Sequence, residues 1–297
     1  MQLKLLSEKQ NGLLNFTDLK LRKYRALYYF MCAFLFLMAL ICILPVIWVS
    51  LSGFKTLDEM YSVPPTLFPS TFDFSIIPRA WNKVKFGKAF LYSAIIMAGC
   101  VFMDVTFNGI AGFILAKVKP VGSAFLNTII FWVMMMPSMG IVTGYMNMIN
   151  FTPLHLNLTG TFWPMWLGAG INAFHIFLMR NMFISIPNAY YEAAIIDGCS
   201  TLGAFFKIFV PLGKPTIMVV VIGTVMGSWG NYMAPLLYLN DTDMIPVALK
   251  LFKLSSFGLM ENEKFMVLTI AILVPIILFA IFSRQIMGGS DSSGVKG

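Results

Sequence analysis

The sequence predicts an all-α integral membrane protein with six transmembrane helices. Hydrophobic residues make up 58% of its 297 residues and charged residues only 11%, whereas a soluble domain carries about 25% charged residues. The mean hydropathy is +0.80. A chain of this size cannot bury so much apolar surface in one water-soluble core, so lipid must be the solvent for much of it. This composition excludes a soluble enzyme, a nucleic-acid-binding protein and a secreted disulfide-rich domain.

Six apolar segments are each long enough to cross a hydrocarbon core of about 30 Å, which takes about 20 helical residues. Their uninterrupted apolar character favours helices over the alternating strands of a membrane barrel. The predicted spans are 26–52, 89–116, 124–149, 161–186, 215–239 and 263–286. A basic, amphipathic leader, 1–25, precedes them, and a tail, 287–297, follows them.

The distribution of Lys and Arg predicts the orientation. With a cytoplasmic N-terminus, 13 of these residues lie inside and 8 outside, which favours both termini in the cytoplasm. Most of them cluster at the ends of apolar runs, so the net charge of +8 indicates anchoring at an anionic membrane surface rather than binding to nucleic acid. The four cysteines form no CxxC pair, and two histidines are too few for a histidine-rich metal site.

Two connections between spans are predicted to lie on the outer side of the membrane, and their compositions differ. The segment 53–88 contains four prolines and is therefore expected to be rigid and irregular. The segment 240–262 places acidic residues around an apolar stretch, 245–254.

The connection 187–214, predicted to lie inside, is expected to form two short helices separated by a turn. Pro187 suits the first position of a helix, and Asp197-Gly198 suits a turn, because glycine adopts a positive φ at little cost. A second helix is expected over 201–209. Small side chains keep the surface of this segment slim enough for another protein's groove, and Glu192 offers a carboxylate to a basic partner.

The same segment carries a motif with fixed spacing. Glu192-Ala193-Ala194 is followed after three residues by Gly198, and nine further residues lead to Ile208-Phe209-Val210-Pro211. This resembles the signature of permease subunits of ATP-binding-cassette importers, Glu-Ala-Ala, three residues, Gly, nine residues, Ile-x-Leu-Pro, with Val210 replacing Leu as the one departure. The alternative, a hairpin that merely links two spans, gives no reason for Glu192 or Gly198.

Three further stretches are similar to the carbohydrate-uptake branch of that family. They are residues 111–122, Trp229 and Asn231 ahead of Pro235, and residues 294–297. The chain therefore resembles the MalG-like permeases of the maltose and oligosaccharide uptake branch. The resemblance implies a type I importer permease in a bacterial plasma membrane, with a cytoplasmic coupling loop between the fourth and fifth spans.

The resemblance also implies how the chain works with others. Glu192 would pair with a basic residue of a separate ATPase subunit. The residues implied in this coupling are Glu192, Ala193, Ala194, Asp197, Gly198, Ile208 and Pro211. The implied partners are a second, related permease, two cytoplasmic ATP-binding-cassette subunits, an extracellular solute-binding protein and the lipid bilayer. Because the chain has no GxxxxGK[ST] phosphate loop, ATP and Mg would bind to the partner ATPase, and this chain would be a transport subunit without a cofactor or enzymatic activity of its own.

Polar and aromatic residues inside the spans are the candidates for the solute pathway, because sugars bind by stacking on aromatic rings and by hydrogen bonds. The candidates are Asn108, Asn172, His175, Trp229, Asn231 and Tyr232. The alternative for Trp229 and Tyr232 is that they only pack between helices. Asp104 is the one acid in the middle of an apolar run, where a charge costs about 2.5–3.5 kcal/mol on insertion scales. It could relay protons, contact the solute or accept hydrogen bonds from a neighbouring helix, and the last role is favoured.

Other functions remain open at this point. A proton-coupled secondary transporter could use Asp104, but it has no use for the motif of the inner segment. A membrane-embedded enzyme lacks the acids and histidines for a metal or acid–base site. Within the importer class, the solute could be another small molecule such as glycerol 3-phosphate, although such an anion calls for basic residues within the spans. A neutral saccharide is the favoured solute.

Overall fold

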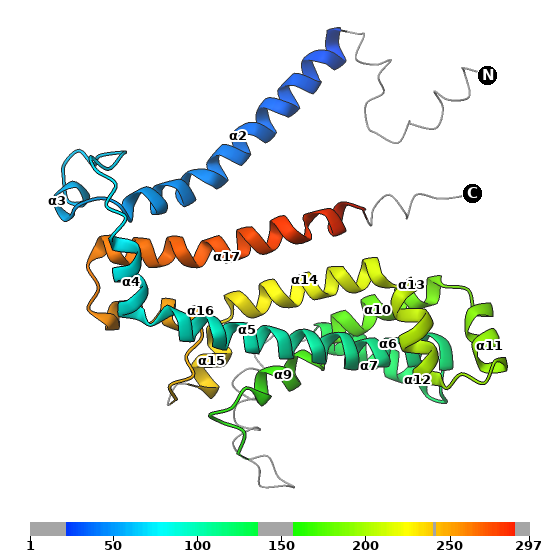
Figure 1. Ribbon diagram of the computed structural model, residues 1–297. Helices are drawn as coiled ribbons and strands as arrows, with labels where there is room; N and C mark the ends of the chain where they lie inside the picture. The colour runs from blue at the N-terminus through cyan, green and yellow to red at the C-terminus, as the bar shows by residue number, and fades with distance from the viewer. Residues whose placement is uncertain (1–21, 136–156, 240–241, 289–297) are drawn as a thin grey trace.

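The computed structural model describes residues 22–135, 157–239 and 242–288, and every regular element within these ranges is helical (Figure 1). The first is the long helix α2 (Arg22–Ser52), which is followed by the short helices α3 (Leu57–Met60) and α4 (Ile76–Val84). The prediction of an entirely irregular segment over 53–88 is therefore wrong. Pro78 does not interrupt α4, because it lies in the first turn, where a backbone N–H has no partner inside the helix.

The second apolar run forms one rod from Phe86 to Val118. Its parts are α5 (Phe86–Met103), the π-helical turn η2 (Asp104–Asn108), α6 (Gly109–Phe113) and a second π-helical turn, η3 (Ile114–Val118). A π turn adds one residue to a helical turn and is frequent at functional sites. Helix α7 (Ser123–Met135) comes next. The remainder of the third predicted span, 136–149, lies outside the described residues.

The fourth predicted span is not one continuous helix. It consists of α9 (Trp163–Ala169) and α10 (Ala173–Ser185), with a break between them. The inner segment follows as α11 (Ala189–Ile196), α12 (Thr201–Ala204), the π turn η4 (Phe205–Phe209) and α13 (Val210–Leu212). The axis of α11 makes an angle of 82° with the rod Trp163–Ser185 that precedes it. The axis of α14 (Lys214–Gly230) makes an angle of 87° with the rod Thr201–Leu212.

The fifth predicted span is also interrupted. Helix α14 ends at Gly230, and α15 (Met233–Tyr238) begins after a break at Asn231 and Tyr232. The chain continues through α16 (Val247–Phe252) and the 3-10 turn η5 (Leu254–Phe257) to α17 (Glu261–Gly288). Helices α2, α5 with its π turns, and α17 are long and apolar enough to cross a membrane, and two further spans arise if each bent pair is one span.

The helices form a layered bundle with distinct ends (Figure 1). Helices α3 and α4 lie at one end and α11 to α13 at the other, and α2 and α17 point their N- and C-terminal ends, respectively, toward the α11 end. Helix α2 buries none of its most apolar window, so its surface is available to lipid or to a partner chain.

Buried charged groups fix the end at α4. The ammonium group of Lys83 lies 2.7 Å from the buried carboxylate of Glu263, which joins α4 to α17. Lys250 donates to the backbone carbonyl oxygens of Val84 and Lys85, where α4 ends. Burial lowers the pKa of Lys250, and nearby lysine charges lower it further. The contacts of Lys250 tie the segment 240–262 to the start of the Phe86–Val118 rod.

Candidate functional site

A cavity of about 470 Å³ lies between the Phe86–Val118 rod, α9, α10, α14, α15 and α16. This volume falls within the range of about 300–1,000 Å³ that is typical of ligand pockets. Five residues singled out in the sequence line it. They are Asp104, Asn172, His175, Trp229 and Asn231. Residues from three different apolar runs thus meet at one cavity.

Both helix breaks lie at this cavity. Asn172, at the start of α10, accepts a hydrogen bond from the backbone N–H of His175, and its own N–H donates to the side chain of Asn108. Asn231, just after α14, accepts a hydrogen bond from the backbone N–H of Ala234. Non-helical backbone at membrane depth is tolerated where it is buried in protein or lines a cavity. The breaks therefore place polar backbone and amide groups beside the cavity.

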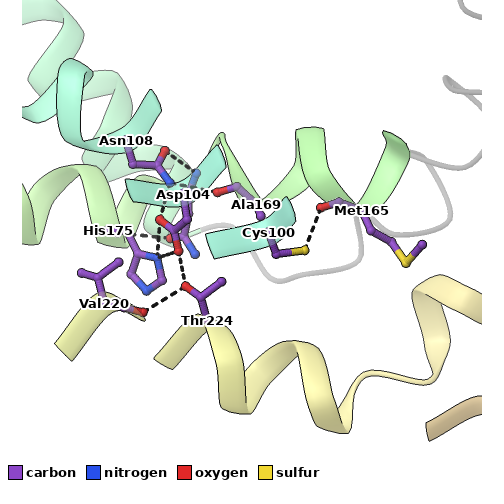
Figure 2. Close-up of polar contacts among 9 residues, drawn as sticks. Cys100, Asp104, Asn108, Met165, Ala169, His175, Val220 and Thr224 are labelled. Atoms are coloured by element: carbon purple, nitrogen blue, oxygen red, sulfur yellow. Dashed lines mark hydrogen bonds and ion pairs between the residues drawn. The ribbon is translucent and has the colours of Figure 1, made fainter. Parts of the chain in front are cut away.

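Asp104 accepts hydrogen bonds that join three helices (Figure 2). Its carboxylate lies 2.7 Å from Nδ2 of Asn108 and 2.8 Å from Nδ1 of His175, and it also accepts from the hydroxyl of Thr224. Asp104 is 1% exposed. These contacts link η2, α10 and α14, and they satisfy an acid that would otherwise be costly within the membrane.

The neighbouring polar groups have partners as well. Asn108 donates to the carbonyl oxygen of Ala169 at the end of α9, and Thr224 also donates to the carbonyl oxygen of Val220. The thiol of Cys100 lies 3.6 Å from the carbonyl oxygen of Met165 (Figure 2). Thr224 was not singled out in the sequence, because a threonine in an apolar helix commonly bonds only to its own backbone.

The two aromatic candidates differ in their surroundings. Trp229 lines the cavity but is only 8% exposed, and its ring centroid lies 5.6 Å from that of Phe90. It therefore packs between helices and faces the cavity at the same time. Tyr232 is not among the cavity-lining residues. Its ring stacks on that of Phe252 in α16, with the centroids 4.6 Å apart.

Helix α11 presents most of the motif to solvent. Glu192, Ala193, Asp197 and Gly198 are exposed, whereas Ala194 is buried against the bundle. Large apolar side chains on the same helix are exposed too. They are Tyr190, Ile195 and Ile196. An exposed apolar patch beside the carboxylates of Glu192 and Asp197 is the kind of surface that binds another protein.

The turn after α11 depends on Gly198. This residue has a φ of +78°, which favours glycine, and its N–H donates to the carbonyl oxygen of Ile195. Ser200 then begins α12 and accepts a hydrogen bond from the backbone N–H of Gly203. Of the last motif residues, Ile208 is half-buried and Pro211 is exposed in the first turn of α13.

An aromatic cluster fastens α11 to the membrane-embedded helices. Phe113 of α6 is at its centre and is 1% exposed. The centroid of its ring lies within 6 Å of four others, those of Phe183, Tyr191, Phe205 and Phe209. Tyr191 belongs to α11, and Phe205 and Phe209 belong to η4, so the cluster joins both parts of the inner segment to α6 and α10.

Interrupted helices around a cavity that carries a few polar groups are typical of membrane proteins that transport solutes. The family comparison agrees with this class. Residues 108–291 match the model of the family described as binding-protein-dependent transport system inner membrane component, and the chain belongs to this family. The prediction of an importer permease is confirmed, and the chain is a transport subunit rather than an enzyme.

Individual relatives extend the comparison. The chain is 30% identical over 214 residues to the polygalacturonan/rhamnogalacturonan transport system permease protein YtcP of Bacillus subtilis, a match covering 72% of this chain and 73% of that one. It is 26% identical over 268 residues to the diacetylchitobiose uptake system permease protein NgcG of Streptomyces coelicolor, covering 88% and 86% of the two chains.

A solved structure has the same fold. It is the crystal structure of a bacterial ABC transporter involved in the import of the acidic polysaccharide alginate. The TM-score is 0.77 at 21% identity, and the match covers 89% of this chain and 98% of that chain.

Proposed function

We propose that this chain forms half of the translocation pathway of an ATP-driven importer for a sugar or oligosaccharide. Relatives named for polygalacturonan/rhamnogalacturonan and for diacetylchitobiose support this class of solute. Because a related fold belongs to a transporter of an acidic polysaccharide, the proposal extends to oligosaccharides of either kind. The preference for a neutral saccharide stays a prediction.

The cavity is the proposed contribution of this chain to the solute pathway. Asn172 and Asn231 bring amide groups to it and Trp229 brings an aromatic face, which are the groups that hydroxyl-rich rings bind. His175 shares the cavity but is held by Asp104. Tyr232 contacts α16 instead, so it is proposed to pack rather than to bind the solute. Asp104 is proposed to hold helices together, since its contacts are with protein donors.

Helix α11 is the proposed coupling helix. The observation that carries this proposal is that Glu192 and Ala193 are exposed on a helix whose other side is fixed, through Ala194 and Tyr191, to the core of the bundle. A partner bound to the exposed side would therefore pull on packed membrane helices rather than on a free loop. Closure of a partner ATPase around bound ATP and Mg supplies the movement in this scheme.

The proposed assembly contains a second, related permease, two cytoplasmic ATPase subunits and an extracellular solute-binding protein in a bacterial plasma membrane. Both termini of the chain are proposed to lie in the cytoplasm. The direction of α2 and α17 toward the α11 end in Figure 1 supports this orientation. The bare surface of α2 suits lipid and the second permease.

Purification of the tagged chain from native membranes tests the assembly. Mass spectrometry should identify a second permease and an ATP-binding-cassette subunit, and a sugar-loaded solute-binding protein should stimulate ATP hydrolysis. A lone chain or a homo-oligomer without ATPase activity would contradict the proposal.

Substitution of Glu192 tests the coupling helix. Glu192→Ala should reduce the stimulated ATPase rate and solute uptake, because it removes the one exposed carboxylate of α11 without changing its packing. Asp58→Ala is a matched control, since Asp58 is an exposed acid in the first turn of α3 at the opposite end. Normal uptake by Glu192→Ala would show that α11 does not couple through this residue.

A further inference from the structure

The side chain of Lys117 ends between the segments that surround α11. Lys117 lies in the π turn η3, and its ammonium group donates to the carbonyl oxygen of Ile186 and to Oδ1 of Asn188, the latter at 2.8 Å. Ile186 ends α10, and Asn188 precedes α11. The same nitrogen lies 5.6 Å from the ring centroid of Phe209 in η4, a distance typical of a cation–π contact.

The contact with Asn188 replaces an ordinary helix cap. An asparagine at this position usually accepts a hydrogen bond from a backbone N–H of the first turn. Here the side chain of Asn188 makes no such cap bond to α11, and its oxygen faces Lys117 instead. The entry into α11 is therefore fixed to η3 by a charged donor rather than capped within the helix itself.

The ammonium group is largely withdrawn from solvent. Lys117 is 9% exposed, and no carboxylate lies within ion-pair distance of it among the residues that the structure describes. A buried charge is costly unless it is paired and hydrogen-bonded. Two oxygens of the connection between α10 and α11 and the ring face of Phe209 in η4 offset part of this cost, and any movement of Ile186 or Asn188 away from η3 would leave the charge without those oxygens.

We propose that Lys117 is a positioning residue that holds α11 at a fixed angle to the membrane helices and so lets force on α11 reach them. This inference rests on the proposed role of α11 as the coupling helix. Lys117 touches neither solute nor nucleotide in this scheme, and it acts through Asn188 and Ile186. Loss of the ammonium group should leave the body of α11 helical and exposed, but free to pivot about the Ser185–Asn188 connection, and its first turn, whose amides bond to Pro187 and Asn188, should open more often.

The test uses the full importer complex in lipid nanodiscs. Lys117→Met removes the ammonium group and keeps an unbranched apolar side chain, and Lys117→Arg keeps the donor. Asn188→Ala removes one acceptor without altering the membrane rod. Lys119→Met is the matched control, because Lys119 is an exposed lysine two residues away. Hydrogen exchange is measured for peptides covering 189–196 and, as an internal reference, 214–230.

Lys117→Met should raise exchange at the first amides of α11 at least tenfold and leave α14 unchanged. Asn188→Ala should give a smaller increase, while Lys117→Arg and Lys119→Met should stay near the wild type. ATPase stimulation by the binding protein, loaded from a hydrolysate of polygalacturonan and rhamnogalacturonan, should fall at least fivefold in Lys117→Met. A general structural role would instead raise exchange in α14 as well.

Unchanged exchange of α11 in both Lys117→Met and Asn188→Ala would overturn the inference. If Lys117→Met fails to assemble, Asn188→Ala decides alone. Glu192→Ala separates this inference from the proposed function. Loss of stimulation in Glu192→Ala but not in Lys117→Met refutes the role of Lys117 only. Retained stimulation in Glu192→Ala refutes coupling through Glu192, while hydrogen exchange still reports whether Lys117 holds the helix.

Discussion

Removing the carboxylate of Asp104 should loosen the junction of three helices. Asp104 accepts from Asn108, His175 and Thr224. Hydrogen bonds between membrane helices contribute about 0.6 kcal/mol on average and up to about 1.7 kcal/mol, so losing three costs ~2–5 kcal/mol. Asn108 and Thr224 each keep a second acceptor, a backbone carbonyl oxygen. Asp104→Ala should therefore lower the free energy of unfolding by ~2–3 kcal/mol, the lower part of this range.

The amide Asp104→Asn should behave differently. Its oxygen, in the place of Oδ1, still accepts from Asn108. Its NH₂ group, in the place of Oδ2, donates to the hydroxyl oxygen of Thr224, which itself donates to Val220, and to Nδ1 of His175 once the imidazole carries its proton on Nε2. The network then remains satisfied at a cost of about 1 kcal/mol or less. Because no carboxyl proton is needed for this role, transport should continue at a near-normal rate.

The assay compares both variants in the assembled complex, by thermal unfolding and by solute uptake. Asp104→Ala should lower the midpoint temperature of unfolding clearly and Asp104→Asn should lower it slightly. The decrease in Thr224→Val should be intermediate. Complete loss of uptake in Asp104→Asn with normal assembly and an unchanged midpoint would refute the reasoning. Asp104 would then contact the solute or carry a proton.

Three other substitutions follow from the geometry. Gly112→Ala should destabilise the bundle by ~1–3 kcal/mol in thermal unfolding, because the added Cβ would lie 2.9 Å from the α10 backbone. Gly87→Ala is the control, which should not destabilise the bundle because the space around Gly87 is open. Gly198→Leu should cost about 1–2 kcal/mol at its positive φ without any clash and should weaken recovery of the ATPase subunit, while Gly198→Asn, which tolerates this conformation, should retain it. Hydrogen bonds from the side chain of Ser70 and from the backbone N–H groups of Thr56 and Ser70, the latter two at 2.8 Å, lower the pKa of Glu59 from 4.5 to about 2. Because the pKa of Glu59 is lower in the folded state, its stabilisation of the segment 56–70 is present above about pH 4.5 and is lost as the pH falls through 2. Pepsin cleavage within 56–70 should therefore increase between about pH 4.5 and about pH 2 in the wild type, but not in Glu59→Gln.

The sequence predicts the three continuous apolar helices, α2, the Phe86–Val118 rod and α17, because lipid imposes a length and an apolar composition on each of them. The inner segment is predicted in outline, because Gly198 constrains the backbone locally. Helix α11, however, begins at Ala189 rather than at Pro187, and the second rod continues through Pro211 to Leu212. The structure has two short helical rods there, separated by a turn at Gly198 with a φ of +78°. Residues whose effect is local are thus informative without knowledge of the fold.

The helix breaks are not predicted, because an apolar run containing Asn172 or Asn231 reads as a continuous span. Each asparagine accepts a hydrogen bond from a backbone N–H three residues further on, and the N–H of Asn172 also contacts Asn108, 64 residues away, which only the fold brings close. The same holds for Lys117, whose neighbours in the sequence indicate only a basic end of a span. Its contacts with Ile186 and Asn188, 69 and 71 residues away, arise from the fold.

Polar contacts along the Phe86–Val118 rod connect the surroundings of the cavity with the start of α11. Asp104 and Asn108 join the rod to the start of α10 beside the cavity, Gly112 lets it approach the middle of α10, and Lys117 binds the chain where α10 ends. Because the rod contacts α10 at three points along its length, separating the two helices at one point would strain the contacts at the other two. We therefore expect a force on α11 to move α10 and the rod as one body against α14, where Thr224 makes the remaining bond to Asp104. Because Asp104 and Thr224 both line the cavity, we expect loss or retention of that bond to accompany any change in the access of solute to the cavity.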